Sequence, residues 1–521
     1  MVCAWSSGTA EYVRMPEVPP PPRFDRATWL ALLVVSVAAF FTYLYYFDYP
    51  AVPFWDERYY IVDAQKYIHG VYFVDLHPPL GKLLVALGER LFGGNVDTTQ
   101  FLNVTYWATT VPEGFSFAGF RFFPVLLAWL TAPLLFLLFF TITRSRVLAM
   151  LLCGLYIFDN ALVVHLRGAM LEGPLLFFTV LLLLAAVWLL GTPPAARRRQ
   201  RTLALVMGIA LGCVLTTKSI GVVMVWVPIA AAWGLRRERR RALECLTIAA
   251  IVSAVVVLAV WEVHFTLARH LNPALQEQGF YQTPSPAARA FLQSGQRVPI
   301  AAFPAMLGEA LRYARWYDSA RPAIDFCRTD EKASPFWMWP IGARSVAYWW
   351  DTDDGGKSFR YLYLQVNPVV WWTALAGLIA AVSLLVGSAI APPARPLKHR
   401  FLLTMFTGLY VAYFVPFRWI HGVMFLYHYF IPLILSFVLL ALVIDEITQL
   451  GSRTITMGHK QTALALWLVA AVACFWFYKP MTYYERPLTP EALQRRAIVA
   501  LWDLRCITCP HADGLCTSAQ K

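Results

Sequence analysis

The sequence is poor in charge. Only 14% of its 521 residues are Asp, Glu, Lys or Arg, whereas 59% are hydrophobic and the mean hydropathy is +0.54. A soluble protein of this length would have about a quarter of its residues charged. The scarcity of charge therefore excludes a soluble globular enzyme and indicates a chain that is buried in lipid over most of its length.

Other features are also missing. The chain shows no internal repeat of fixed period, no polar stretch large enough to fold alone, and no aromatic-basic module of the kind that binds nucleic acid. No small-residue cleavage site follows the first apolar run, so we expect this run to stay as an anchor. The nine cysteines are scattered, except for Cys506, Cys509 and Cys516, for which a disulfide, free thiols and a metal site all stay open.

Long apolar runs are abundant. About eleven of them are long enough to cross a hydrocarbon core. They are centred near residues 28–47, 119–140, 147–158, 169–190, 203–217, 219–234, 244–264, 365–388, 401–417, 424–443 and 461–478. We therefore predict an all-α polytopic membrane protein, with an N-terminal tail at 1–27, a membrane domain at 28–478 and a C-terminal tail at 479–521.

The basic residues predict an orientation, because short basic loops face the cytoplasm. With the N-terminus inside and eleven crossings, five basic clusters fall on the cytoplasmic side. These clusters lie at 144–146, 197–201, 236–241, 395–400 and 453–460. The net charge of +13 is then explained by topology and by contact with anionic lipid. The loops 48–118 and 265–360 and the C-terminal tail are left on the exoplasmic side.

Three of the segments outside carry ionisable residues that the span pattern does not require. Such residues at the edge of a membrane are costly unless they bind or react with something. Arginine and histidine opposite carboxylates suit a phosphate-bearing ligand and a proton-accepting base. The residues are Asp56, Glu57, Asp75, His77 and Lys82 after the first span, Arg167 and Glu172 after the third, and Arg418, His421, Tyr427 and His428 after the ninth.

At these residues the chain resembles the protein O-mannosyltransferases, within the GT-C superfamily of glycosyltransferases. The resemblance rests on a series of short motifs in the family's order: the Asp56-Glu57 pair, DLHPPLGK (75–82), FDNALVVHLRGAMLE (158–172), GCVLTTKSIG (212–221), WEVHF (261–265) and MFLYHY (424–429). The shorter loop 265–360, without the MIR domain of eukaryotic members, resembles bacterial members. The family usually has Asp where this chain has Glu172.

The resemblance implies a GT-C fold and a mannosyl transfer from polyprenyl-phosphate-mannose to Ser or Thr hydroxyls of secreted or membrane proteins, with inversion. Asp56 is then the catalytic base, with Glu57 as its partner. The donor's sugar and phosphate would contact Asp75, His77, Lys82, Arg167, Glu172, Arg418, His421 and His428. No metal and no cofactor beyond the lipid-linked donor is required.

Several alternatives stay open. Asp56 and Glu57 could cap a helix, Asp63 could be structural, and Lys218 at the end of the fifth span could be packing or lipid-facing. The acceptor could be a lipid or glycan, and a lipid-linked-sugar transporter is the rival from another class. The expected location is a bacterial inner membrane, with membrane lipids as partners, no nucleic acid, and the secretion translocon as a candidate for delivering the acceptor.

Overall fold

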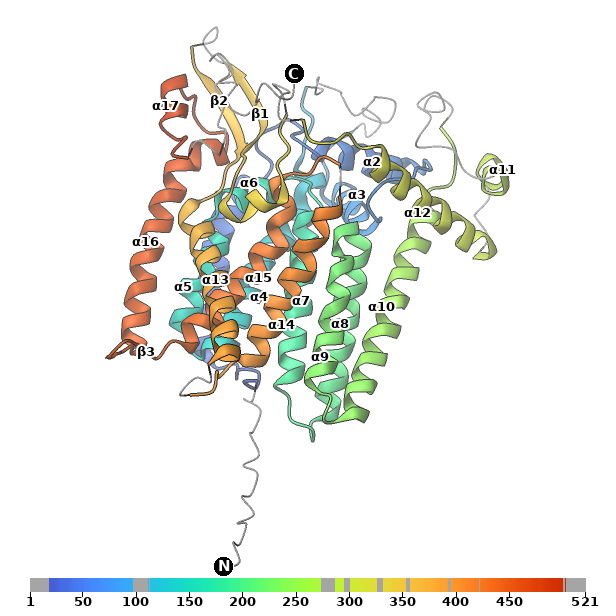
Figure 1. The fold of residues 1–521 in the computed structure, drawn as a ribbon. Helices are drawn as coiled ribbons and strands as arrows, with labels where there is room; N and C mark the ends of the chain where they lie inside the picture. The colour runs from blue at the N-terminus through green and yellow to red at the C-terminus, as the bar shows by residue number, and fades with distance from the viewer. Residues whose placement is uncertain are drawn as a thin grey trace, which may run out of the picture.

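The computed structural model describes residues 18–96, 111, 113–272, 286–294, 300–325, 331–352, 357–391, 395–420, 422–499 and 502. Within these ranges the chain is a bundle of long helices capped at one end by short helices and a hairpin (Figure 1). Nine of the described helices are long and apolar enough to cross a membrane. The bent pair α5–α6 and the shorter apolar helix at 219–234 occupy the two remaining predicted spans, so each of the eleven runs coincides with a helix.

The membrane-crossing part follows the predicted order. The last predicted span of the first half, α10, is also the longest helix, with 29 residues. The helices are α1 (Arg26–Ala39) continued by the π-helix η1 (Phe40–Leu44), α4 (Ala118–Thr143), α5 (Arg146–Ile157), α7 (Glu172–Leu190), α8 (Arg197–Thr217), η2 (Ser219–Val225) with α9 (Trp226–Gly234), α10 (Arg239–Leu267), α13 (Pro368–Ile390), α14 (Arg400–Phe414) with η6 (Val415–Trp419), η7 (Leu426–Tyr429) with α15 (Phe430–Glu446), and α16 (Met457–Thr482).

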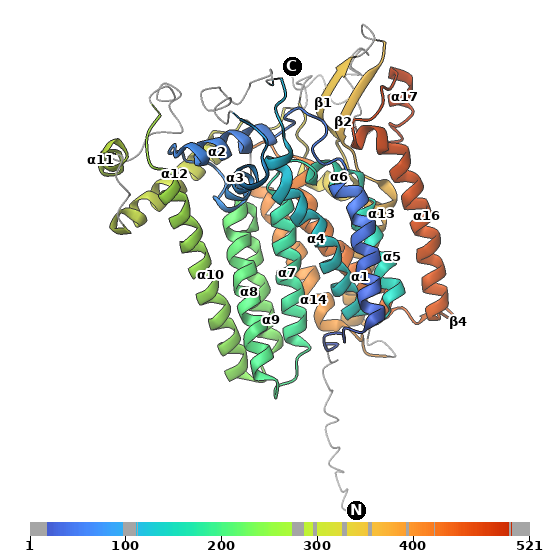
Figure 2. The ribbon, with the colours of Figure 1, turned by 180° about the vertical axis from the view of Figure 1, so that it is seen from behind.

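The remaining elements lie mostly at one end of the bundle, which we call the site end (Figures 1 and 2). They are α2 (Glu57–His69), α3 (Leu80–Phe92), α6 (Asn160–Leu166), α11 (Pro286–Ser294), η4 (Ile300–Ala302), α12 (Phe303–Ala320), η5 (Phe336–Ile341), β1 (Val346–Thr352), β2 (Phe359–Leu364) and α17 (Pro490–Gln494). Strands β1 and β2 pair antiparallel with a bulge between Ala347 and Trp349. The predicted loop 265–360 therefore contains helices, the whole of β1 and the first two residues of β2.

The opposite end, which we call the basic end, holds the first described residues and the small hairpin of β3 (Gln449–Leu450) and β4 (Arg453–Thr454) (Figure 1). Helices α5, α8, α10 and α14 all begin there with an arginine. The basic clusters thus gather at one end and the candidate site residues at the other, as the charge pattern predicts. The separation follows from the alternation of helix direction along the chain.

The core of the bundle lies where α4, α7 and α15 meet. The apolar part of α15 is 89% buried, whereas that of α10 is only 17% buried and that of α16 22% buried. A helix that is apolar all round and buried is shielded by its neighbours, whereas exposed apolar faces at the periphery are suited to lipid. The candidate site residues are attached to these buried helices: Glu172 is the first residue of α7, and Tyr427 lies in the turn directly before α15.

Candidate active site

Asp56 stands at the first turn of α2 but does not cap it. The residue before it, Trp55, has the left-handed backbone angle φ of 51°, which is uncommon for a bulky side chain and is often found at functional sites. The half-buried Asp56 carboxylate accepts a hydrogen bond of 2.8 Å from the Tyr427 hydroxyl, 371 residues away in the chain, and makes no capping bond to α2. The helix-cap alternative is therefore wrong for Asp56.

The surroundings of Asp56 raise the proton affinity of its carboxylate. Burial raises its pKa above the ordinary value, and the nearby Lys218 ammonium and the Tyr427 hydrogen bond oppose that rise. A base is most effective when its pKa approaches the working pH. One carboxylate oxygen of Asp56 is thus held by Tyr427, and the raised pKa is the direction that a proton-accepting group would need.

Replacing Tyr427 with Phe tests this tuning. Because the hydroxyl's hydrogen bond lowers the pKa of Asp56, its loss should raise that pKa. The acid limb of the pH–rate profile should then move to higher pH. A hydrogen bond to a charged group contributes ~1.5–3 kcal/mol, so kcat/KM should also fall roughly tenfold or more. The measurement is the pH–rate profile of the variant beside that of wild type; a profile unchanged from wild type would contradict the coupling between Tyr427 and Asp56.

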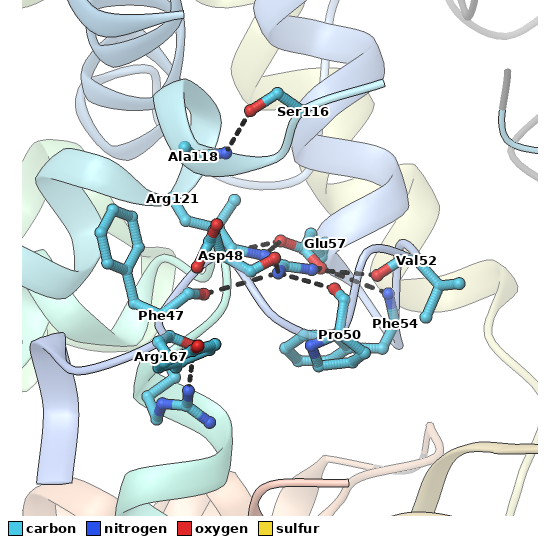
Figure 3. Close-up of polar contacts among 12 residues, drawn as sticks. Phe47, Asp48, Pro50, Val52, Phe54, Glu57, Ser116, Ala118, Arg121 and Arg167 are labelled. Carbon is cyan, nitrogen blue, oxygen red and sulfur yellow. Dashed lines mark hydrogen bonds and ion pairs between the residues drawn. The ribbon is translucent and has the colours of Figure 1, made fainter. Parts of the chain in front are cut away.

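Glu57 has a different environment from its neighbour. Its side chain is fully buried and forms a two-pronged ion pair with Arg121, at 2.6 Å from Nε to Oε1 and 2.9 Å from Nη2 to Oε2 (Figure 3). It also accepts from the backbone N–H groups of Phe54 at 3.2 Å and Ala169 at 3.0 Å. Both carboxylate oxygens are thereby occupied. This favours a role for Glu57 in positioning α2 over a role in contacting substrate.

Arg121 connects Glu57 to the entry loop of α2. Its guanidinium also donates to the carbonyls of Asp48 at 2.7 Å, Pro50 at 2.8 Å and Val52 at 2.9 Å (Figure 3). The loop that delivers Asp56 is therefore clamped to α4 by a single buried side chain. Charge-assisted bonds of this kind are among the strongest that a protein makes.

A second charged cluster lies beside Asp56. Glu172 at the start of α7 binds the Lys218 ammonium through one oxygen and lies 2.9 Å from His165 Nε2 through the other. The other nitrogen of His165 is 2.5 Å from the Tyr348 hydroxyl of β1, and its ring stacks on Tyr427 at 4.7 Å. The Lys218 ammonium lies 5.1 Å from the centre of the same Tyr427 ring. Tyr427 thus joins this cluster to Asp56.

The loop between α2 and α3 carries the predicted DLHPPLGK residues. The Lys82 ammonium binds Asp75 at 2.5 Å and the His77 carbonyl at 2.8 Å, and its stem is buried. Burial raises the pKa of Asp75, but Lys82 and His77 outweigh it, so that pKa falls below its ordinary value. Asp63 joins the network through Lys66 at 3.1 Å and Lys82 at 3.9 Å, consistent with a structural part.

His77 faces the second cluster. Burial and the nearby Lys218 charge lower its pKa to about 3, so the imidazole is neutral at ordinary pH. Its Nδ1 is buried without a hydrogen-bond partner among the described residues. Since buried polar atoms are normally satisfied, this nitrogen is available to a ligand.

The other predicted donor-binding residues are less central. The Arg167 guanidinium binds the carbonyls of Tyr45 and Tyr46, directly after η1, and lies 4.4 Å from the centre of the Tyr483 ring. Burial lowers its pKa to about 10. Arg418 is exposed in η6, and His428 is held by its own turn, 2.9 Å from the Phe425 carbonyl. His421 lies outside the described residues, as do Cys506, Cys509 and Cys516.

Sequence reasoning gave no role to three residues that organise the site. Lys218 is 2% exposed and paired with Glu172, so the lipid-facing alternative is wrong. Arg121 stands inside the predicted span 119–140, and His165 lies in the motif FDNALVVHLRGAMLE. An ionisable residue within an apolar run, as Arg121 is, or between two such runs, as Lys218 is, signals a buried partner, and this signal could have identified both residues. The described residues contain no group of three or more His, Cys, Asp or Glu side chains placed to hold a metal ion.

Comparison with known families decides the relationship. The family profile described as "Dolichyl-phosphate-mannose-protein mannosyltransferase" matches residues 33–269, and that described as "C-terminal four TMM region of protein-O-mannosyltransferase" matches residues 320–502. The chain belongs to the protein O-mannosyltransferase family. The first profile covers the Asp56, His77, Glu172 and Lys218 region, and the second covers Tyr427.

Curated protein O-mannosyltransferases match over limited stretches. Protein O-mannosyltransferase 1 of Drosophila pseudoobscura is 27% identical over 180 residues, which are 32% of this chain and 19% of that protein. The protein mannosyltransferase 3 of Saccharomyces cerevisiae is 26% identical over 254 residues, 46% of this chain and 33% of its own length. The chain thus covers only about a fifth to a third of these relatives.

The fold is shared over a much longer range. The S. cerevisiae protein O-mannosyltransferase Pmt1-Pmt2 complex, solved with its sugar donor, contains a chain that superposes with a TM-score of 0.75 at 15% identity. The superposition covers 93% of this chain and 95% of the other. Together with the helical bundle, this similarity shows the GT-C fold that the motifs predict.

Proposed function

We propose that this family member transfers mannose from a polyprenyl-phosphate-mannose donor to Ser or Thr hydroxyls of secreted or membrane proteins. The observation that carries the proposal is the half-buried Asp56 carboxylate, fixed by Tyr427 and placed beside the Lys218–Glu172 pair. A base and a cation side by side are what transfer from a lipid phosphate requires. The names of the curated relatives and of the superposed structure support the same donor and acceptor classes.

In the proposed step, the acceptor oxygen attacks the anomeric carbon of the sugar while Asp56 takes the hydroxyl proton. The bond between that carbon and the phosphate oxygen breaks, and the lipid phosphate leaves with the electron pair. Direct attack with one carboxylate inverts the anomeric configuration. Lys218 and the neutral His77 would face the departing phosphate, and the family's donor-binding assignments for Asp75, Lys82, Arg418, His421 and His428 stay predictions.

In this scheme Glu57 and Arg167 have structural roles beside those that the sequence predicts. Glu57, bound by Arg121, would hold α2 in register so that Asp56 points at Tyr427. Arg167, whose Nη2 binds the carbonyls of Tyr45 and Tyr46 directly after η1, would stabilise the site end, and its Nε, unpartnered among the described residues, leaves a donor for the phosphate. Neither assignment requires a cofactor beyond the lipid-linked donor.

The charge pattern supports an orientation in the membrane. We propose that the basic end faces the cytoplasm and the site end the exoplasmic space of a bacterial inner membrane. The domain limits 28–478 and 479–521 remain part of this proposal. Delivery of the acceptor by the translocon would place an unfolded chain beside the site end.

The test is transfer in detergent from radiolabelled polyprenyl-phosphate-mannose to Ser/Thr-rich peptides. Label on the peptide that is released by β-elimination supports the proposal. Label on a lipid or glycan keeps the family and rejects the protein acceptor. A donor that neither binds nor is consumed would favour the transporter alternative.

The part of Lys218 gives a separate prediction. Lys218→Met should raise the donor KM and lower kcat/KM by roughly a hundredfold, because removing one charged stabiliser of a developing anion costs about that much. The acceptor KM should stay near its wild-type value, and Lys218→Arg should recover part of the activity. Steady-state kinetics with each substrate varied in turn measures both.

The matched control is Lys66→Met, which removes another buried lysine, paired with Asp63 within α2. It should disturb folding to a similar degree without a selective change in donor KM. If both variants change donor and acceptor KM alike, Lys218 acts through stability only.

A further inference from the structure

An apolar groove of about 570 Å³ runs between α9 and α14, away from the active site. Its walls are the faces of two antiparallel helices, with lining residues recurring every three or four positions. From Arg400 to Ala412 the α14 wall rises about 18 Å at 1.5 Å per residue. That length is close to one leaflet of a hydrocarbon core, roughly 15 Å.

The groove has a charged mouth at the basic end. Arg236, just beyond α9, and Arg400, the first residue of α14, both line it and both are exposed. Arg236 donates to the Trp233 carbonyl at 3.1 Å, and its guanidinium lies 5.0 Å from the centre of the Trp233 ring. Neither arginine is in an ion pair with a carboxylate of the described chain. Two cations therefore face an apolar slot without an ion-pair partner among the residues that the structure describes.

We propose that this groove holds one acyl chain of an anionic phospholipid, with the lipid phosphate between Arg236 and Arg400. An elongated apolar slot suits an acyl chain, and a basic pocket between membrane helices suits an anionic head group. The guanidinium fork binds phosphate oxygens in pairs. The lipid belongs to the leaflet next to the basic end, opposite the leaflet that borders Asp56.

A second occupant would be the prenyl tail of the donor. The phosphate of that lipid, however, would lie near Lys218 at the site end. Its uncharged tail would then present no anionic group to the two arginines at the basic end of the groove. The unpaired charges therefore favour the phospholipid. The proposal does not depend on the proposed transfer reaction, because it concerns binding at the other end of the bundle.

Gly408 offers a way to fill the groove. It lines the α14 wall, and a Cβ added there meets no atom within 4 Å. Gly408→Leu should therefore fill the slot without a clash, and a helix interior favours Leu over Gly. It blocks the acyl chain and leaves both arginines in place.

Native mass spectrometry of the whole chain in detergent, with phosphatidylglycerol or phosphatidylcholine added, tests the proposal. Wild type should retain phosphatidylglycerol at concentrations where phosphatidylcholine dissociates. The double variant Arg236→Gln/Arg400→Gln should weaken phosphatidylglycerol binding on the order of 10- to 30-fold, at about 1 kcal/mol for each arginine near an anionic head group. Gly408→Leu should weaken binding as well.

The control is Arg239→Gln/Arg240→Gln, which removes two exposed arginines of the same cluster that do not line the groove. It should retain the lipid, and thermal unfolding of all variants should match wild type. Equal loss in the control would show attraction to a basic surface only and overturn the proposal. Equal retention of the two lipids, or of phosphatidylglycerol by every variant, would also overturn it. Displacement by polyprenyl phosphate that depends on Gly408 but not on the arginines would assign the groove to the donor tail.

Discussion

Asp56→Asn should reduce kcat/KM for mannosyl transfer by about 10²–10⁴-fold, the usual contribution of a general base. Asn has the size of Asp and can still accept the hydrogen bond from Tyr427, so the fold and donor binding should persist. What is lost is the charge that accepts the proton. Radiolabel transfer at saturating donor measures the loss, with donor binding measured in parallel on the same preparation.

The wild-type pH profile provides an independent check on the same residue. Because burial raises the pKa of Asp56 and the reactive form is the carboxylate, the rate should fall as pH drops through that raised value. The acid limb should therefore lie above the ordinary range of an aspartate and vanish in Asp56→Asn. The control is Glu244→Gln. Glu244 is partly exposed at the basic end, where it pairs with Arg201. If Asp56→Asn keeps more than a tenth of the activity, another group is the base.

Arg121→Gln should cause the largest loss of stability among single changes at the site end. It leaves the Glu57 carboxylate buried without its cation and frees the carbonyls of the loop 48–52. Removing one partner of a buried ion pair costs about 3–5 kcal/mol. The measurement is the thermal or denaturant unfolding midpoint of the detergent-solubilised protein.

An exposed arginine gives the matched comparison. Arg146 pairs with Asp25 near the basic end, where the two side chains are 37% and 54% exposed. Exposed pairs contribute about 0–1 kcal/mol, so Arg146→Gln should barely move the midpoint. Equal midpoints for the two variants would mean that the Arg121 clamp does not stabilise the fold.

The helices were predictable because hydropathy is a local property. Each of the eleven apolar runs coincides with a helix, although the run 147–158 forms only the first part of a pair bent by 64°. The bend lies at Asp159, which accepts from the N–H of Leu162 in the next helix and from Trp371 Nε1 on α13. The predicted run ends at residue 158, at the break, but the run does not indicate how the next helix is oriented, because Trp371 is more than two hundred residues away.

Candidate site residues were less predictable than helices. Composition and motifs pointed to Asp56, His77 and Glu172, and the structure brings these three to one end of the bundle. They also pointed to Arg167 as a phosphate ligand, which stays a prediction: its Nη2 binds the carbonyls of Tyr45 and Tyr46, whereas its Nε has no hydrogen-bond partner among the described residues. A side chain's type suggests what it can bind, but only its neighbours determine which of its hydrogen bonds are already made.

By itself the sequence determined the class of the protein, the order of its long apolar helices, and the separation of the basic clusters from the candidate site residues. These depend on hydropathy and on charge in short stretches, which are readable without contacts. Only the tertiary structure decided which partners the adjacent carboxylates of Asp56 and Glu57 bind. Arg121 of α4 binds Glu57, while Tyr427 before α15 binds Asp56. The difference arises because successive residues of a helix point in different directions and so meet different elements.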